Sequence, residues 1–387
     1  MRLEANDAEV SPLMVRSTAT PCVSNHEAPN CLFDIRTRSY RISGINEYFS
    51  DTRAHLLKNL LTDIAGVKVG HADDARLASG VTAILFDKPA VAAIDVRGGG
   101  PGTREEAALR PESTVEAVDG FALSGGSALG LDAAGGVQSW LAEHGRGFRI
   151  RDAVIPIVPG AICFDLLNGG DKAWGRFPPY RDLGYAAAAA ASGDFSLGSV
   201  GAGLGATTAN FKGGLGSASA TTSTGAQVSA IVVVNAVGSV TVGDGPWFWA
   251  APFEVGGEFG GRGLPSSFTS DMLAMRLKGG PAATPAENTT IAVVVTDAIL
   301  TKAQAKRLAM IAQTGMARAI YPVHAPLDGD TVFAAATCAK PIDPVYGLTE
   351  LGAVAANVLS RAIARGVFTA TALPFAGALP AWKDRFG

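Results

Sequence analysis

Asn288, Thr289 and Thr290 stand directly before an apolar run, residues 291–298, that is typical of a buried β-strand. On spacing alone, the triplet is most simply a turn asparagine followed by β-branched residues that begin the strand. The triplet also fits the acceptor pattern for N-glycosylation, but the N-terminus lacks the basic and apolar segments of a secretory signal, so we set glycosylation aside. The remaining interpretation is chemical.

In the chemical interpretation Thr289 is a nucleophile. If the turn strains the peptide bond between Asn288 and Thr289, the threonine hydroxyl can attack the preceding carbonyl, form an ester, and let water cut the chain. The α-amine released on Thr289 has a reference pKa of about 7.7–8.0, so near neutral pH it can serve as the base for its own hydroxyl. One residue would then supply both the nucleophile and the base.

Two glycine-rich stretches, residues 95–105 and 201–210, could bring backbone N–H groups close to an anion such as a phosphate. Neither matches a P-loop. Gly203, Gly205 and Thr208 also lack the strand–turn–helix unit, with an acidic residue downstream, that a dinucleotide fingerprint requires. Tight turns and close sheet packing are therefore the favoured interpretation of both stretches.

The thiols and imidazoles are not spaced as metal ligands. They are Cys22, Cys31, Cys163, Cys338, His26, His55, His71, His144 and His324. None forms a C-x-x-C pair or a histidine pair four residues apart, so we expect no metal and no cofactor.

The composition favours a globular protein that acts on small molecules. Hydrophobic residues make up 48% of the 387 residues and charged residues 17%, and the net charge is −3. Without a dense run of lysine and arginine, we expect no nucleic-acid partner and no membrane-surface partner. The longest apolar stretches fall short of a membrane span, so a soluble, cytoplasmic protein is expected.

The secondary-structure signals begin after a polar, poorly periodic segment, residues 1–58, which we treat as an N-terminal extension. The rest, residues 59–387, is expected to be a single domain. Strands are expected within residues 66–71, 81–87, 90–99, 153–162, 218–244, 291–298 and 330–337, and helices within residues 123–145, 180–192, 301–320 and 349–368.

In the first helix Leu129, Ala133, Val137 and Leu141 would share one face, because they lie four residues apart. Strands and helices occur in clusters and do not alternate regularly. This arrangement favours two packed sheets with helices outside, a four-layer α/β/β/α sandwich.

Seven motifs in a fixed order resemble peptidase family S58, the DmpA-like, self-processing N-terminal-nucleophile-like hydrolases. They are LTDIAGVKVGHA, AIDVRGGGPGTRE, LSGGSALGLDAAGGV, KGGLGSASA, VVVNAVG, ENTTIAVVVTDA and LDGDTVFAAAT, and they span about residues 60–370. Members of the family include β-peptidyl aminopeptidases, the L-aminopeptidase/D-esterase and the nylon-oligomer hydrolase. The resemblance implies the same α/β/β/α fold.

The resemblance also implies a role for individual residues. Thr289 matches the nucleophile released by cleavage after Asn288, which would leave fragments 1–288 and 289–387. Asn235 matches an asparagine whose amide donates to the oxyanion, and such a donor is worth about 2.7–4 kcal/mol. Without the resemblance, Asn235 would be interpreted as a strand-end residue bonded to local backbone.

Asp328 and Asp330 match two acidic or hydroxyl positions that hydrogen-bond the nucleophile and its amine. Two carboxylates separated by one glycine can both face a cation, although an ordinary Asp-Gly-Asp turn has the same sequence. The aspartate pair resembles the nylon-oligomer hydrolase, whereas the β-aminopeptidases have Ser and Glu at these places.

Several family members place a lysine near the nucleophile, and Lys212 is the nearest candidate. An ungapped alignment from residues 201–210 puts Asn210 at that position instead, so both remain open. Leu129 occupies a position where some members have an aromatic residue with a hydroxyl. Leucine cannot donate a hydrogen bond, so oxyanion stabilisation would depend more on Asn235 and on backbone N–H groups.

We therefore predict a self-cleaving amide or peptide hydrolase that forms an acyl ester on Thr289, with an aminopeptidase acting on short peptides as the first expectation. An endo-type hydrolase of linear amide oligomers is the alternative within the same chemistry. A non-cleaving protein that binds a small anion in its glycine-rich loops, and an acyltransferase like the ornithine acetyltransferases, are alternatives of other classes. The resemblance also implies a homo-oligomer, a tetramer of cleaved pairs.

Overall fold

The computed structural model describes residues 57–279 and 288–387. The predicted N-terminal extension, residues 1–58, lies almost wholly outside these ranges, as do residues 280–287 ahead of the predicted cleavage site. The boundaries predicted for the extension and for a single domain therefore stay predictions.

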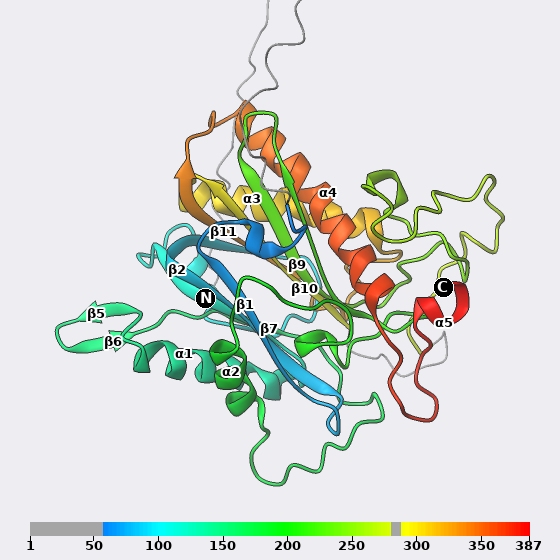
Figure 1. The fold of residues 1–387 in the computed structure, drawn as a ribbon, viewed down its shortest axis with the longest axis horizontal. Coiled ribbons are helices and arrows are strands. Elements are labelled where there is room, and N and C mark those ends of the chain that lie inside the picture. Colours follow the sequence, from blue (N-terminus) through cyan, green and yellow to red (C-terminus); the bar gives the residue numbers. More distant parts are fainter. Residues whose placement is uncertain (1–56, 280–287) are drawn as a thin grey trace, which may run out of the picture. The chain divides into compact units, whose positions relative to one another are not determined.

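The described residues form the predicted α/β/β/α sandwich (Figure 1). The first β layer contains β1 (Val67–Asp74), the first half of β2 (Ser79–Val96), β3 (Thr103–Arg104), β4 (Ala117–Ser124) and β7 (Gly160–Ile162). The second contains the end of β2, β8 (Gly214–Thr221), β9 (Gln227–Asn235), β10 (Thr289–Ala298) and β11 (Thr331–Lys340).

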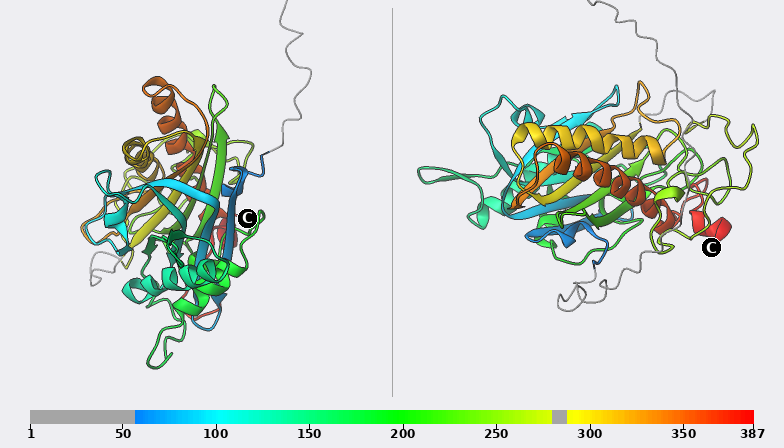
Figure 2. Two further views of the ribbon diagram at one scale, coloured as in Figure 1. Left: turned by 90° about the vertical axis from the view of Figure 1, so that its left-hand side faces the viewer. Right: turned by 90° about the horizontal axis from the view of Figure 1, so that it is seen from above.

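Helices cover the outer face of each β layer. The first layer packs against α1 (Ala133–Glu143) and α2 (Tyr180–Ala189), and the second against α3 (Lys302–Ala319) and α4 (Tyr346–Thr369). Figure 2 shows α3 and α4 together on one side of the strands. A short helix, α5 (Trp382–Phe386), contacts α4, and a two-stranded hairpin joins β5 (Phe148–Ile150) to β6 (Ala153–Ile155).

Strand β2 belongs to both β layers. Its residues 79–86 pair with β1, and its residues 91–96 pair with β11. The pairing with β4 changes register between Leu85 and Ala90, around exposed Asp87 and Lys88 and the following Pro89. Proline cannot donate to a ladder, which favours a bend there. The two strands predicted at residues 81–87 and 90–99 are therefore one bent strand that carries the hydrogen-bond ladder from one layer into the other.

The central core lies between the two β layers. The rings of Phe121 on β4 and Phe333 on β11 meet there with centroids 4.9 Å apart. Strand β10 is buried along all ten residues, because alternate side chains enter this core and the core beneath α3 and α4. A strand covered on both faces needs a continuous apolar sequence, which is what residues 291–298 provide.

The helices predicted at residues 180–192, 301–320 and 349–368 are confirmed as α2, α3 and α4. The helix predicted at residues 123–145 begins later than expected, because residues Ser127–Asp132 form a 3₁₀ turn and α1 starts at Ala133. Leu129 lies in that turn with 45% of its surface exposed, so it does not share the buried face of Val137 and Leu141.

Helix α4 is long and apolar enough to cross a membrane by length and composition alone. In this fold 72% of its most apolar window is buried inside the protein, where it packs against β8 and β9. Its apolar sequence is thus accounted for by contact with the sheet.

Candidate active site

Four of the predicted site residues meet at one end of β9, β10 and β11. Thr289 is the first residue of β10 and lies opposite Asn235, the last residue of β9, in the antiparallel ladder. On the other side, Asn288 forms a parallel bridge with Asp328 just before β11 begins. Thr289, Asn235 and Asp328 are all buried.

The Asn288 carbonyl is contacted by both groups that a self-cleavage would require. The Thr289 Oγ1 donates to this oxygen at 2.5 Å, and the Gly329 N–H donates to it at 2.8 Å. A preorganised backbone N–H on a carbonyl oxygen stabilises the negative charge that develops when the carbonyl is attacked. The sequence did not single out Gly329; the available signal was its position between the two predicted aspartates.

Asp330 organises the backbone around Thr289. Its Oδ1 accepts from the Thr290 N–H at 2.8 Å, and its Oδ2 accepts from the His324 N–H at 3.0 Å and lies 2.9 Å from His324 Nδ1. The predicted contact with the Thr289 hydroxyl is not the one formed here: Asp330 instead fixes the residue next to Thr289. His324 was not among the predicted site residues.

Asp328 is held in an environment that favours its neutral form. One oxygen, Oδ2, accepts from the Ala325 N–H at 2.8 Å, and the buried Oδ1 has no hydrogen-bond partner among the described residues. Burial, and after it repulsion from Asp330, raise the pKa of Asp328 to about 7, while Lys278 and His324 oppose the shift. The carboxyl can therefore hold or release a proton near neutral pH.

The amide of Asn235 is fixed on both of its ends. Its Oδ1 accepts from the Thr207 N–H at 3.0 Å and from Lys278 Nζ at 2.9 Å, and its Nδ2 donates to the Phe164 carbonyl at 3.0 Å. Sequence reasoning missed Lys278, which lies in a polar segment without periodicity. Burial lowers the pKa of this half-buried lysine to about 7.

Of the two alternatives for the site lysine, the structure brings Lys212 and not Asn210 to this region. Asn210 donates to Thr241, Gly243 and Asp244, away from Asn235. The Lys212 ammonium is buried and donates to three backbone carbonyls, those of Gly203, Ala206 and Gly213. An ammonium has three N–H donors, so these bonds use all of them.

The glycine-rich loops have the favoured structural role. In the first loop the N–H groups of Gly98, Gly99 and Gly100 donate to carbonyls of residues 325–330, so they are not free to hold an anion. A Cβ on Gly98 would lie 2.2 Å from the Asp328 carbonyl oxygen. The second loop presents carbonyl oxygens to the Lys212 ammonium, which is the opposite polarity from a phosphate cradle.

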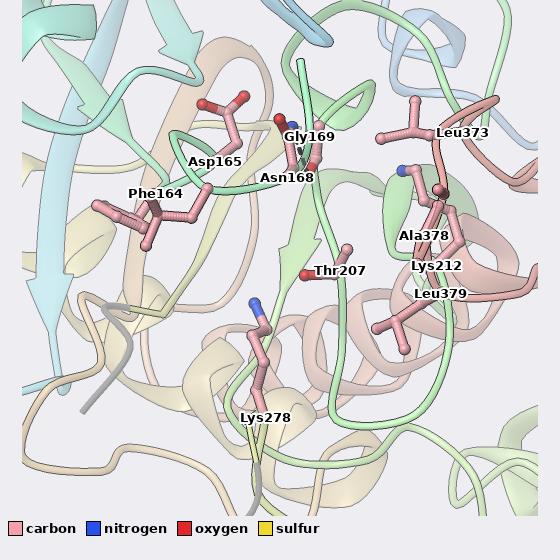
Figure 3. Close-up of a pocket in the computed structure, with 15 residues that line it drawn as sticks. Phe164, Asp165, Asn168, Gly169, Thr207, Lys212, Lys278, Leu373, Ala378 and Leu379 are labelled. Carbon is pink, nitrogen blue, oxygen red and sulfur yellow. Dashed lines mark hydrogen bonds between the residues drawn. The ribbon is translucent and has the colours of Figure 1, made fainter. Parts of the chain in front are cut away.

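A cavity of about 360 Å³ is lined in part by residues that contact Asn235, and Figure 3 shows side chains that line it. Phe164, Thr207 and Lys278 both line this cavity and contact Asn235. Leucine and alanine residues of the segment 373–379 form its apolar wall, and Asp165 and Lys212 also line it. Neither Asn235 nor Thr289 lines this cavity, so Asn235 is linked to it only through the residues that it contacts.

No group of three or more His, Cys, Asp or Glu in residues 57–279 and 288–387 is arranged to hold a metal ion. The groups assembled at the site are a hydroxyl, carboxyls, amides and ammonium groups. This chemistry suits attack on a carbonyl with proton transfer.

Solved structures of two aminopeptidases share this fold, and one of them has a variant of the N-terminal-nucleophile hydrolase fold. The L-aminopeptidase D-Ala-esterase/amidase of Ochrobactrum anthropi superposes with a TM-score of 0.61 at 18% identity, covering 84% of this chain and 90% of the other. A β-aminopeptidase of Burkholderia sp. gives a TM-score of 0.57 at 22% identity, with coverages of 84% and 90%. The chain therefore has the fold of this class of hydrolases.

The chain belongs to peptidase family S58, whose family model matches residues 59–378. An uncharacterized aminopeptidase of Mycobacterium tuberculosis is 44% identical over 347 residues, which are 85% of this chain and 98% of the relative. A 6-aminohexanoate-oligomer endohydrolase of Kocuria sp. is 28% identical over 321 residues, covering 79% and 85%. The protein is thus a hydrolase of peptide or amide bonds.

Asp328 makes the stability depend on pH in a testable way. Because its pKa is raised to about 7 in the folded protein, the folded state holds a proton that the unfolded chain releases above pH of about 4. The free energy of unfolding from this group should therefore fall as the pH rises between those values. Asp328→Asn should remove this part of the slope in urea unfolding.

Asp343→Asn is the matched control, because backbone N–H groups of Val345 and Tyr346 lower the pKa of exposed Asp343. The contribution of Asp343 to the free energy of unfolding changes at lower pH than that of Asp328. The pH slope assigned to Asp328 should therefore persist in Asp343→Asn. Both variants are measured in the Thr289→Ala chain, so that one covalent chain unfolds whether or not Thr289 is able to cut it. An unchanged slope in Asp328→Asn would contradict the raised pKa.

Proposed function

We propose that the chain cuts itself between Asn288 and Thr289 and that Thr289 then hydrolyses small peptides or amides through an acyl ester. The observation that carries the proposal is the convergence of the Thr289 hydroxyl and the Gly329 N–H on the Asn288 carbonyl. The hydroxyl is the nucleophile next to the bond to be cut, and the N–H is a donor for the developing oxyanion.

The self-cleavage proceeds in two steps. Thr289 Oγ1 bonds to the Asn288 carbonyl carbon, the C–N bond breaks, and the nitrogen takes a proton to become the α-amine of Thr289. Asp328, bridged to Asn288 and with a pKa of about 7, is the group we assign to supply that proton, and the proton that leaves the Thr289 hydroxyl protonates Asp328 again. Water then hydrolyses the ester, which leaves a carboxylate on Asn288 and a free hydroxyl on Thr289.

Substrate hydrolysis repeats the same chemistry. The α-amine of Thr289 takes the hydroxyl proton as the hydroxyl attacks the substrate carbonyl, the leaving amine departs with that proton, and water resolves the acyl ester. Asp330 holds the Thr290 N–H, so the backbone that carries the nucleophile stays in place. Asn235 donates from Nδ2 to the oxyanion of the substrate.

We propose an aminopeptidase acting on short peptides. The mycobacterial relative named as an aminopeptidase supports this choice. The cavity of about 360 Å³ lies at the small end of the range for ligand sites, about 300–1,000 Å³, which favours a short substrate. Endo-type cleavage of linear amide oligomers is the second candidate, supported by the Kocuria relative and by the Asp328–Asp330 pair.

The alternatives of other classes have less support. A binding protein for a small anion would use the glycine-rich loops, whose described N–H groups in residues 98–100 already donate to backbone carbonyls. An acyltransferase would need an amine acceptor that competes with water for the acyl ester.

The intact mass of the denatured protein tests the self-cleavage. We expect two fragments that together weigh the chain plus one water, with Thr289 as the new N-terminus. Thr289→Ala should give the whole 39.5 kDa chain, because it has no hydroxyl to attack. The cut protein should release the N-terminal residue from short peptides.

Thr289→Ser is the matched variant, since it keeps a hydroxyl and should still be cut. A wild-type chain that stays whole after prolonged incubation would sink the proposal. Cleavage of internal bonds in amide oligomers, without action on peptide N-termini, would favour the second candidate instead.

Gly329 offers a test that keeps the Thr289 hydroxyl but changes its position. A Cβ at this residue would lie 2.7 Å from Thr289 Oγ1 and 2.9 Å from its Cγ2, so Gly329→Ala should displace the hydroxyl from the Asn288 carbonyl. Because the hydroxyl and the Gly329 N–H would no longer be aligned on the same carbonyl, we expect the self-cleavage to slow by about 10²–10³, the cost of losing an aligned oxyanion donor. A time course of intact mass measures it.

Gly193→Ala is the control, because nothing lies within 4 Å of a Cβ there. It should be cut at the wild-type rate. If Gly329→Ala is cut at the wild-type rate and has the wild-type unfolding temperature, then self-cleavage does not depend on the arrangement of the Gly329 N–H and the Thr289 hydroxyl.

We also propose a homo-oligomer, a tetramer of cleaved pairs. The β5–β6 hairpin supports assembly, because Phe148, Ile150 and Ile155 expose 62%, 53% and 43% of their surfaces, and such patches mark interfaces. Figure 1 shows this hairpin projecting beyond α1. Sedimentation at micromolar concentration should give the tetramer mass, and a monomer would refute the assembly.

A further inference from the structure

We propose that Lys278 is a positioning residue that fixes the Asn235 amide for oxyanion stabilisation. The inference rests on the proposed function, because it concerns the acyl transfer at Thr289. It adds a second lysine to the site, distinct from Lys212. It also assigns a role in the reaction to the end of the segment that lines the cavity at Lys278 and Gly279.

The contacts of Lys278 single it out. Its Nζ donates to Asn235 Oδ1 at 2.9 Å and to the Asn235 main-chain oxygen at 3.4 Å, and its own N–H donates to the Val237 carbonyl at 2.8 Å. The backbone bond holds the lysine beside the end of β9, and Figure 3 shows the side chain projecting into the cavity near Thr207.

This contact determines which way the Asn235 amide faces. An amide carries one acceptor oxygen and one nitrogen with two hydrogens. A rotated amide would place its NH₂ group against both the Lys278 ammonium and the Thr207 N–H, so the observed orientation is strongly favoured. One Nδ2 hydrogen is used by the Phe164 carbonyl, and we assign the other to the oxyanion at Thr289, the residue opposite Asn235 in the ladder.

A cation on Oδ1 also makes Nδ2 a better donor, because hydrogen bonds in a chain polarise one another. Lys212 cannot serve in this way, since its three N–H groups are used by the carbonyls of Gly203, Ala206 and Gly213. Lys212 thus holds together the glycine-rich loop between α2 and β8, whereas Lys278 reaches the amide beside the nucleophile.

Removing the charge of Lys278 should shift the titration of a neighbouring group. Loss of a side chain that only packs would not cause such a shift. The neighbours of Lys278 are the buried Cys163 thiol, the Asp328 and Asp165 carboxyls, which favour its charged form, and the ammonium of Lys212. Asp328 in turn faces Asp330, Lys278 and His324. Because the Lys278 charge lowers the pKa of Asp328, removing that charge should move the titration of Asp328 to higher pH.

The test compares Lys278→Met and Lys278→Arg in the full chain, with self-cleavage followed by intact mass and peptide hydrolysis by kcat and KM. We expect Lys278→Met to lower kcat by about 10-fold or more with little change in KM, since an oxyanion donor acts mainly in the transition state. The limb of the kcat–pH profile set by Asp328 should move upward. Lys278→Arg keeps the charge, so its limb should stay near the wild-type position and its kcat should be largely restored.

Lys302→Met is the matched control. Lys302 is the first residue of α3, and desolvation lowers its pKa as well. Its ammonium donates to two backbone carbonyls, those of Ala108 and Ser113. Its loss should leave kcat and the pH profile unchanged. If Lys278→Met does not fold, Lys278→Gln, which keeps a polar head without the charge, carries the same comparison.

The outcomes separate the inference from the proposed function. If the wild-type chain is neither cut nor active, the proposed function fails. If wild type is cut and active and Thr289→Ala is not, while Lys278→Met has the wild-type kcat and pH profile, then only the inference is overturned. A lowered kcat with an unshifted pH limb that Lys278→Arg does not rescue would also overturn it, because it would assign Lys278 a packing role.

Discussion

The parallel pairing of β10 with β11 is the constraint on which the site depends. Ile291 pairs with Thr331, and the same register continued toward the strand ends brings Asn288 beside Asp328 and the Gly329 N–H onto the Asn288 carbonyl. A shift of one residue would turn every side chain of β10 to the opposite face, and the apolar contacts on both faces of the strand oppose it. The core therefore sets the geometry at the carbonyl.

Burial of the strand also explains the electrostatics of the site. Because β10 lies between two packed layers, its first residue is already inside the protein, and the carboxyl and ammonium groups gathered there have lost water. Desolvation is the largest cause of the raised pKa of Asp328 and of the lowered pKa of Lys278. Opposite shifts that both end near 7 leave these groups able to exchange protons at neutral pH.

The sequence predicted the layers and much of the site for different reasons. The β10 run and helices α2, α3 and α4 have periodicities that burial imposes, so they can be identified from sequence. Thr289, Asn235, Asp328 and Asp330 were found through ordered motifs, and the structure places them together.

What the sequence missed was determined by contacts between distant segments. Lys278 reaches Asn235 across 43 positions from a stretch without periodicity, and the contribution of Gly329 is a main-chain N–H that no side-chain pattern reveals. Likewise, two apolar runs separated by Asp87, Lys88 and Pro89 look like two strands, and only their pairing with β1 and β11 shows that they are one.

The same pairing bears on what a cut between Asn288 and Thr289 would do to the fold. Strand β10 is bonded along its length to β9 and β11, and its side chains fill two cores, so its position depends on those contacts and not on the peptide bond at its start. Asn235 and Lys278 lie on the large fragment, while Thr289, Asp328 and Asp330 lie on the small one. A nucleophile at a strand end can thus gain a free amine without losing the neighbours that position it.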